Sequence, residues 1–179
     1  IEPVAISDIL DTHSRPKVHE YDNCILISAK MLRYDEDLAE IIAENLVLIL
    51  KENLLLTFQE RMGDVFNPVR ERLRKNRRRI RSSGPDYLAF ALLDIVIDNY
   101  IYLISVIGDK IEALDDELIR NPSTDKLRVI NDLKGEINFL RKNIKPCREM
   151  VMNFAKLDSD LIDNGMYIHL QELQNNIEM

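Results

Sequence analysis

The sequence predicts an α+β protein, in which an antiparallel three-stranded sheet is followed by a long antiparallel helical hairpin and the start of one more helix. Three observations support this class. Apolar residues alternate over one early segment, two further apolar runs flank a short polar turn, and two long later segments carry apolar residues three or four positions apart. We expect the sheet in residues 1–83, the hairpin in 84–163 and the last helix in 164–179.

The first predicted strand runs from Cys24 to Leu32. Ser28 and Lys30 lie on its polar face, and the face turned toward the core holds Ile25, Ile27, Ala29 and Met31, which is typical of a half-buried strand. Two more strands are predicted at residues 46–50 and 54–58. The polar residues 51–53 between them suit a hairpin turn, so we expect three antiparallel strands in chain order.

Capping signals place the helices. Asn67 is expected to cap a short helix with Pro68 in its first turn, and residues 82–85 (Ser-Ser-Gly-Pro) begin a helix that runs from Asp86 to about Arg120. A turn at residues 121–124 then precedes a helix from Lys126 to about Leu157, which Pro146 should kink near Asn143. Asn164 and Gly165 interrupt the chain before a final helix at 166–179.

The two long helices carry matching apolar stripes, which predicts that they fold back on each other as an antiparallel hairpin with coiled-coil spacing. The stripe of the first is Ile107, Ile111, Leu114 and Leu118, and that of the second is Leu127, Ile130, Leu133, Ile137, Leu140, Ile144, Cys147, Val151 and Phe154.

Composition excludes several functions. The chain has 179 residues but only five glycines, widely separated, so it holds neither a P-loop nor a dinucleotide-binding fingerprint. A net charge of −7 argues against nucleic acid as a partner and favours cations. Cys24 and Cys147 share no spacing pattern, and we expect reduced, buried thiols of a cytosolic protein. No catalytic motif is found, so an enzyme is not expected. The first residue is Ile, and we expect an excised fragment.

The segment Tyr87 to Ile107 is apolar for the length of a membrane span. Asp94 and Asp98 would each cost about 2.5–3.5 kcal/mol at the membrane centre, so we expect a core helix buried on two sides instead. The two aspartates share a helix face and present oxygen to a hard cation, or else simply interrupt the apolar face for solubility.

Other polar groups point to no single function. The basic cluster Lys75, Arg77, Arg78, Arg79 and Arg81 suits an anionic headgroup or phosphate, or pairs with acid elsewhere in the chain. An acidic run over residues 109–117 attracts cations or is a solvated face. The three histidines are scattered, which argues against a tetrahedral soft-metal site.

Several strings resemble the cytosolic part of CorA-type magnesium and cobalt transporters. They occur in the family's order along essentially the whole chain: Asp8-Ile9-Leu10, Arg15-Pro16-Lys17-Val18, Phe58-Gln59-Glu60, the string Gly63 to Arg72 (GDVFNPVRER), Asp86-Tyr87-Leu88 with Leu93-Asp94, and Pro146-Cys147-Arg148-Glu149. The glycine-led string is the most specific of them.

The resemblance implies a pentameric channel in the cell (inner) membrane, with this fragment on the cytoplasmic side. Its fold would be a partial α/β/α layer, then the helical hairpin, then the start of a stalk helix that leads to transmembrane helices this fragment lacks. Mg²⁺, with Co²⁺ as a second candidate, would be both the transported and the regulatory ion, and the fragment would sense it at subunit interfaces.

The resemblance also implies where the regulatory ion binds, because carboxylates of neighbouring subunits hold it in the family. The matching positions are Asp8 and Asp94. The family's aspartate on the stalk is replaced here by Leu170, and the nearest carboxylate, Glu172, is rotated away by about 200° on a helix.

Two alternatives remain open. A zinc transporter of the related ZntB branch would share the same resemblance, and a coiled-coil scaffold without an ion role would share the helical pattern.

Overall fold

The computed structural model describes residues 3–35, 40–75, 78–120 and 126–178. Within these ranges the chain forms one antiparallel sheet in the order β1-β2-β3-β4, with the strands at Lys17–Tyr21, Cys24–Asp35, Glu40–Lys51 and Leu54–Gln59. The three predicted strands correspond to β2, β3 and β4. The predicted count of three is wrong, because β1 pairs with β2 through a tight turn that sets Tyr21 opposite Cys24.

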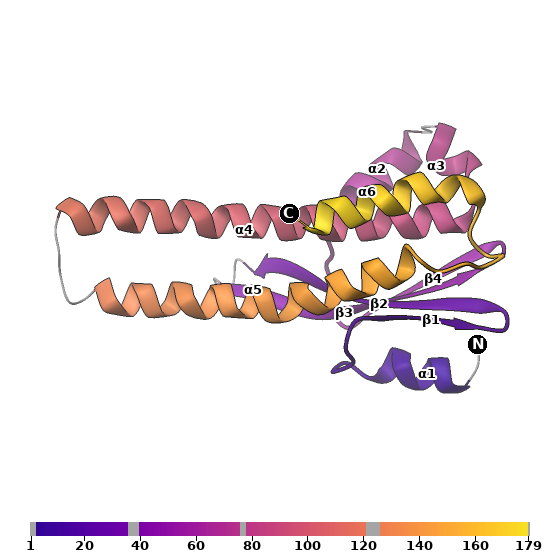
Figure 1. Cartoon of the computed structure of the whole chain (residues 1–179), viewed down its shortest axis with the longest axis horizontal. Coiled ribbons are helices and arrows are strands. Elements are labelled where there is room, and N and C mark those ends of the chain that lie inside the picture. Colours follow the sequence, from indigo (N-terminus) through magenta and orange to yellow (C-terminus); the bar gives the residue numbers. More distant parts are fainter. Residues whose placement is uncertain (1–2, 36–39, 76–77, 121–125, 179) are drawn as a thin grey trace.

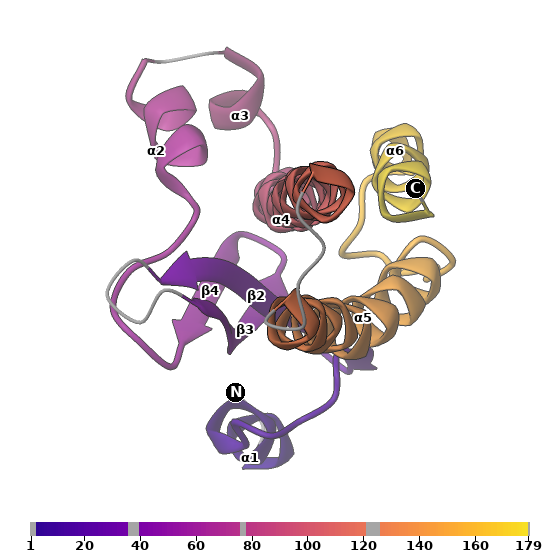
Figure 2. The same ribbon diagram turned by 90° about the vertical axis from the view of Figure 1, so that its left-hand side faces the viewer.

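The sheet is covered on both faces, as the expected α/β/α layer requires. Helix α1 (Pro3–Leu10) lies against one face, and the long helices α4 (Pro85–Arg120) and α5 (Lys126–Phe154) lie against the other (Figure 2). Strand β2 is therefore buried on both faces rather than half-buried. Ile25, Ile27 and Met31 join the main core with α4, whereas Leu26 belongs to a second cluster against which Ile9 of α1 packs.

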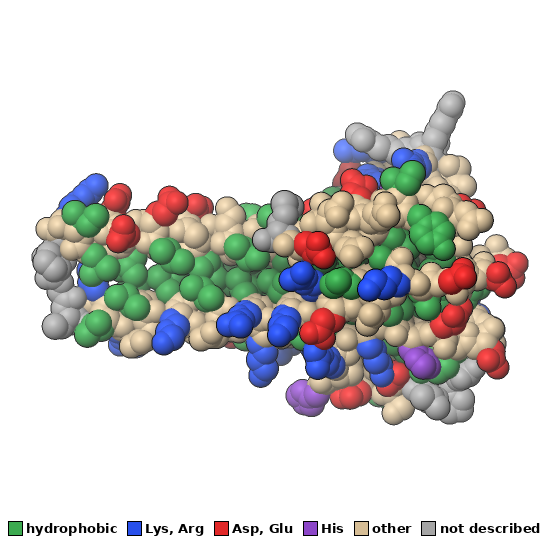
Figure 3. All heavy atoms as spheres, in the orientation of Figure 1, with side chains coloured by type: hydrophobic (Ala, Val, Ile, Leu, Met, Phe, Trp, Pro, Cys, Tyr) green, Lys and Arg blue, Asp and Glu red, His purple; other side chains and the backbone are tan. Residues whose placement is uncertain are grey.

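Helices α4 and α5 run antiparallel and extend together beyond the sheet (Figure 1), which confirms the predicted hairpin. Helix α5 continues through Pro146 and ends at Phe154, three residues before the predicted end. Its stripe is buried near the sheet, at Leu140 and Cys147, and exposed toward the tip, at Leu127 and Ile137. Apolar side chains line the seam of the hairpin in Figure 3. The predicted turn at 121–124 lies outside the described residues.

Helix α4 is a core helix in its first half. Among the described residues it is the one helix long and apolar enough to cross a membrane, and 50% of its most apolar window is buried inside the protein. Phe90, Leu93 and Val96 pack in the main core. The Tyr100 hydroxyl donates to the Lys30 carbonyl and lies 3.1 Å from the Cys147 Sγ, so one buried contact joins the sheet, α4 and α5.

Both cysteines are buried, as expected. Burial raises the pKa of the Cys147 thiol, while its contact with the Tyr100 hydroxyl and the hydrogen bond from the Lys30 backbone N–H partly offset this rise. The thiol therefore acts as a buried hydrogen-bonding group in the neutral form.

A carboxylate inside the glycine-led string organises the start of α2 (Asn67–Arg74). Asp64 Oδ1 accepts a hydrogen bond from the Phe66 backbone N–H at 2.9 Å and from Arg70 Nη1 at 2.7 Å, and Oδ2 pairs with Arg70 Nη2. The predicted Asn67 cap is wrong: Phe66 occupies the cap position without a side-chain cap, and Asn67 is the first helical residue. Gly63 precedes this contact at φ +91°, a backbone conformation that favours glycine.

The C-terminal helix α6 (Tyr167–Glu178) follows a short 3-10 turn at Asn164–Met166, close to the predicted start. Leu170, Leu173 and Ile177 are buried, so that α6 packs on both α4 and α5 (Figure 1). The short helix α3 (Arg78–Ser82) connects α2 to α4.

Candidate metal-binding carboxylates

Asp8 lies on α1 and faces the edge strand β1. Its Oδ1 lies 2.8 Å from Lys17 Nζ, and its Oδ2 accepts a hydrogen bond of 3.4 Å from the Tyr21 hydroxyl. Ile9, the next residue, packs on the small apolar cluster beneath the sheet and fixes α1 there. Each carboxylate oxygen of Asp8 therefore has a partner on β1, and one of the two partners, the Lys17 ammonium, is positively charged.

Asp94 lies on α4 on the side turned toward α6, and is half-buried. Burial raises the pKa of its carboxyl, and the negative charges of Asp98 and Glu172 raise it further. Arg72 and a hydrogen bond with the Asn176 side chain act in the opposite direction and only partly offset the rise. Burial also raises the pKa of Asp98. This edge of α4 is thus acidic and only partly neutralised, the electrostatic condition that favours a bound cation.

Leu170, which the resemblance sets at the position of the family's stalk aspartate, is only 1% exposed and belongs to the main core. Glu172 lies on the other side of α6, where its side chain is 60% exposed. The predicted rotation between the two is therefore confirmed. The same rotation brings Glu172 within electrostatic reach of Asp94, so α6 does carry a carboxylate beside one of the two predicted ligands.

The fold of a single chain does not bring Asp8 and Asp94 together. Helix α1 and helix α4 lie on opposite faces of the sheet (Figure 2), with two apolar clusters and the strands between them. Among the described residues, no group of three His, Cys, Asp or Glu side chains is arranged to hold a metal ion. A site that uses both residues therefore needs a second copy of the chain.

Three neighbours of these aspartates had no role in the sequence-based site: Lys17 and Tyr21 beside Asp8, and Asn176 beside Asp94. Lys17 belongs to one of the strings that resemble the family, but its contact with Asp8 depends on how α1 docks on β1. No spacing in the sequence signals that docking.

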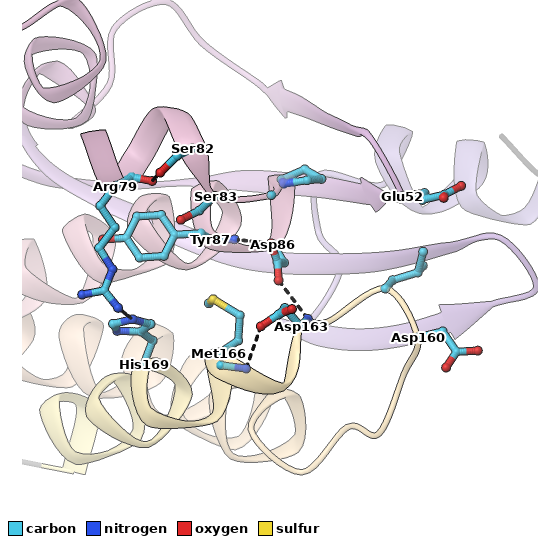
Figure 4. Close-up of a pocket in the computed structure, with 14 residues that line it drawn as sticks. Glu52, Arg79, Ser82, Ser83, Asp86, Tyr87, Asp160, Asp163, Met166 and His169 are labelled. Carbon is cyan, nitrogen blue, oxygen red and sulfur yellow. Dashed lines mark hydrogen bonds between the residues drawn. The ribbon is translucent and has the colours of Figure 1, made fainter. Parts of the chain in front are cut away.

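A cleft of about 510 Å³ lies where α6 begins, between the first turn of α4, helix α3 and the segment 160–166 (Figure 4). Its polar groups are largely paired within the chain. The carboxylate of Asp86 accepts hydrogen bonds from the backbone N–H groups of Tyr87 at 2.8 Å and Asp163 at 3.0 Å. Asp163 in turn accepts one from the Gly165 N–H at 2.7 Å. These contacts join the start of α6 to the start of α4.

The opposite end of this cleft holds a packed basic and aromatic group. The Arg79 guanidinium contacts His169 Nε2 and lies 5.5 Å from the centre of the Tyr87 ring, and the His169 ring packs edge-on against the same ring (Figure 4). Arg79 donates in this contact, so Nε2 of His169 acts as the acceptor. The cleft is best explained as a structural joint between α3, α4 and α6.

The basic cluster predicted around residue 78 is only partly described. Lys75 pairs with Glu71 at 3.1 Å, which agrees with pairing to acid inside the chain, whereas the partner of Arg79 is His169, which is not acidic. Arg77 lies outside the described residues. The acidic run at 109–117 is mostly exposed. Lys126 of α5 partly balances it by pairing with Glu117, whereas the run's own lysine, Lys110, pairs across the hairpin with Glu136 at 2.9 Å.

Comparison with known proteins gives one consistent family. The family described as "CorA-like Mg2+ transporter protein" matches residues 1–179. A cobalt/magnesium transport protein CorA from Thermotoga maritima is 37% identical over 99% of this chain and 53% of its own length. The chain thus spans about half the length of this curated relative.

Two solved structures share the fold. The soluble domain of CorA from Methanocaldococcus jannaschii superposes with a TM-score of 0.83 at 19% identity, covering 99% of this chain and 70% of the other. The ZntB cytoplasmic domain from Vibrio parahaemolyticus superposes with a TM-score of 0.79 at 13% identity, covering 99% and 69%. At these identities the two likenesses establish the architecture alone, and they do not separate a magnesium from a zinc transporter.

Proposed function

The chain belongs to the CorA-like Mg²⁺ transporter family, and from this premise we propose that it is the cytosolic regulatory and gating part of a transporter for Mg²⁺ and Co²⁺. The match to the Thermotoga maritima protein along 99% of the chain carries the proposal. The proposal assigns the chain no catalytic role.

The proposal includes an assembly. Five copies would form a ring on the cytoplasmic side of the inner membrane, and the membrane helices would belong to the half of the family's length that this chain does not span. Residues 1–83 would form the α/β part, 84–163 the hairpin and 164–179 the start of the stalk. The separation of Asp8 and Asp94 supports a ring of copies, because a shared ion needs the α1 side of one copy to meet the α4 side of the next.

The donor chemistry fits a hard divalent cation. Mg²⁺ prefers carboxylate oxygen, keeps several of its waters and needs few protein ligands. The half-buried carboxylate of Asp94, with Asp98 and Glu172 nearby, is a place where a cation relieves repulsion. We therefore propose Asp94 of one subunit and Asp8 of its neighbour as ligands of the regulatory ion.

Regulation would follow from linkage. An ion that binds the closed ring more tightly than the open ring shifts the population toward the closed form by that difference in affinity. Asp8 is fixed by α1 to the sheet and Asp94 by α4 to the core, so the ion would connect two rigid bodies. When the ion leaves, Asp8 of one subunit would face the negative charges around Asp94 of the next, and this repulsion would favour separation of the subunits.

The two proposed ligands are carboxylates, which suit magnesium better than the zinc alternative. Zn²⁺ sites in proteins use imidazole or thiolate ligands in most cases. Here both thiols are buried, and His169 is engaged by Arg79 and the Tyr87 ring. His19 packs against the Tyr21 ring at 4.5 Å.

Thermal unfolding tests the proposal. We expect millimolar Mg²⁺ or Co²⁺ to raise the melting temperature of the chain in its oligomeric form, because a ligand that binds only the folded state stabilises it. Asp8→Ala should weaken this protection, whereas Asp22→Ala, on the turn between β1 and β2, should leave it intact. Equal melting temperatures with and without the ion would contradict the ion-sensing role.

A further inference from the structure

We infer that Lys17 is a built-in counter-ion of Asp8, which a divalent cation must displace in order to bind, and that Lys17 thereby raises the ion concentration at which the domain responds. This inference rests on the proposed role of Asp8 as a ligand. It adds a regulatory residue from β1 to that site.

The contact has the geometry of a replaceable ion pair. Lys17 Nζ lies 2.8 Å from Asp8 Oδ1, on the oxygen that the Tyr21 hydroxyl does not contact. The Lys17 side chain is 40% exposed and the Asp8 side chain 22%. The ammonium can therefore move into water on its flexible stem while the carboxylate stays in place.

The frame around the pair is fixed, so displacement of Lys17 is a local event. Ile9 holds α1 against the sheet, and the segment after α1 is tied to the sheet by two hydrogen bonds: Asn45 Nδ2 to the Asp11 carbonyl at 2.8 Å, and Lys30 Nζ to the Thr12 carbonyl at 3.1 Å. Tyr21 keeps its own contact with Oδ2. Asp8 is thus held in one orientation whether or not Lys17 neutralises it.

Competition follows from charge. A cation at Asp8 Oδ1 occupies the place of the ammonium, and two positive charges cannot share that oxygen at contact distance without repulsion. The carboxylate therefore binds the cation only after it has lost Lys17. Exposed ion pairs of this kind shift an equilibrium by about two- to fivefold, and the shift would appear directly in the apparent affinity for the ion.

The test compares Lys17→Met, which keeps the apolar stem, with the parent chain in a Mg²⁺ titration. The readout is the Mg²⁺ concentration that gives half of the maximal thermal protection. Lys17→Met is expected to lower this midpoint about two- to fivefold, and Lys17→Arg, which retains the charge, is expected to leave it within error. Lys134→Met, at an exposed position of α5, removes the same charge far from Asp8 and should have no effect.

A second pair of variants separates the two ideas. In an Asp8→Ala background, Lys17→Met should no longer change the midpoint. If Asp8→Ala raises the Mg²⁺ midpoint but Lys17→Met leaves it unchanged, the role of Lys17 is refuted, whereas the role of Asp8 as a ligand is retained. If Mg²⁺ protects neither chain, or Asp8→Ala leaves the midpoint unchanged, the ligand role fails and the inference falls with it.

Discussion

Asp94 of α4 and Glu172 of α6 lie close enough for their negative charges to interact across the junction of the two helices. Two residues earlier on α6, the Leu170 side chain is buried and packs in the main core. The junction thus combines an apolar contact that excludes water with an acidic edge that is only partly neutralised. Both features affect the free energy of unfolding even when no ion is bound.

Asp94→Asn should stabilise the ion-free chain at neutral pH. Burial, Asp98 and Glu172 raise the pKa of Asp94 above the ordinary value of 3.8 for an aspartate, so the folded state binds the proton more tightly than the unfolded state does. This contribution to stability is complete below about pH 4 and is lost as the pH rises through the raised pKa. Urea unfolding at pH 7 should show a gain on the order of 1 kcal/mol or less.

The pH dependence provides the control for this prediction. The difference between Asp94→Asn and the parent should close below about pH 4, and Asp115→Asn, at the exposed part of α4, should show no such difference at any pH. A variant that is less stable than the parent at pH 7 would contradict the electrostatic account of Asp94.

Leu170→Asp, which restores the aspartate expected from the family, should destabilise the chain rather than rebuild a site. The side chain is 1% exposed within the main core, and a buried, unpaired carboxylate costs several kcal/mol. Gln171→Asp, on the exposed side of the same helix turn, should change the free energy of unfolding by less than about 0.5 kcal/mol. A Leu170→Asp chain with parental stability would refute the observed packing of α6.

The contact between Asp64 and Arg70 should account for much of the stability of α2. Asp64→Asn replaces a carboxylate that accepts from Arg70 and from the Phe66 N–H, at an expected cost of about 1–3 kcal/mol. The hydrogen bond from Arg70 lowers the pKa of Asp64 below the ordinary value of 3.8 for an aspartate. The stabilisation is therefore present above about pH 4 and lost as the pH falls through the lower value in the folded state.

Urea titrations at pH 7 and pH 3 check this prediction. The difference between the parent and Asp64→Asn should shrink at the lower pH, whereas Asp158→Asn, at an exposed position, should match the parent at both. An effect of Asp64→Asn that grows on acidification would have the wrong sign for an ion pair.

Tyr100→Phe should weaken the joint between the sheet, α4 and α5. The change removes the hydroxyl that donates to the Lys30 carbonyl and contacts the Cys147 Sγ, in a buried place where water does not replace it. A cost of about 1–2 kcal/mol is expected, measured by chemical unfolding. Tyr102→Phe, whose ring is 61% exposed, is the matched control. Equal effects of the two changes would mean that the Tyr100 hydroxyl makes no net contribution.

Sequence periodicity predicted the elements whose packing is regular. The alternation from Cys24 to Leu32 and the spacing of Leu133, Leu140 and Cys147 reflect burial directly, because apolar side chains repeat at the period of the element that buries them. The hairpin of α4 and α5 could be predicted for the same reason, and Pro85 marked the start of α4.

Elements without such a period were missed. Strand β1 has only five residues, of which Lys17, His19 and Glu20 are polar, and its pairing with β2 comes from the turn and from main-chain hydrogen bonds. Helix α1 is short and buries chiefly Ile9 against the second face. The interaction of Glu172 with Asp94 joins segments far apart in the chain. The contact of Lys17 with Asp8 spans only nine residues but depends on how α1 docks on β1, which no local pattern encodes.

The proposed regulatory ion is shared: Asp8 of one subunit and Asp94 of its neighbour would hold it together. Chains that carry Asp8→Ala can be mixed with chains that carry Asp94→Asn to test this sharing. An interface is intact where the Asp94→Asn chain supplies its Asp8 and the neighbouring Asp8→Ala chain supplies its Asp94. In an equal, randomly assembled mixture about a quarter of the interfaces of a ring are intact. Mg²⁺ should protect the mixture more strongly than it protects either variant alone, and a mixture that responds no better than its two components would exclude a shared ion.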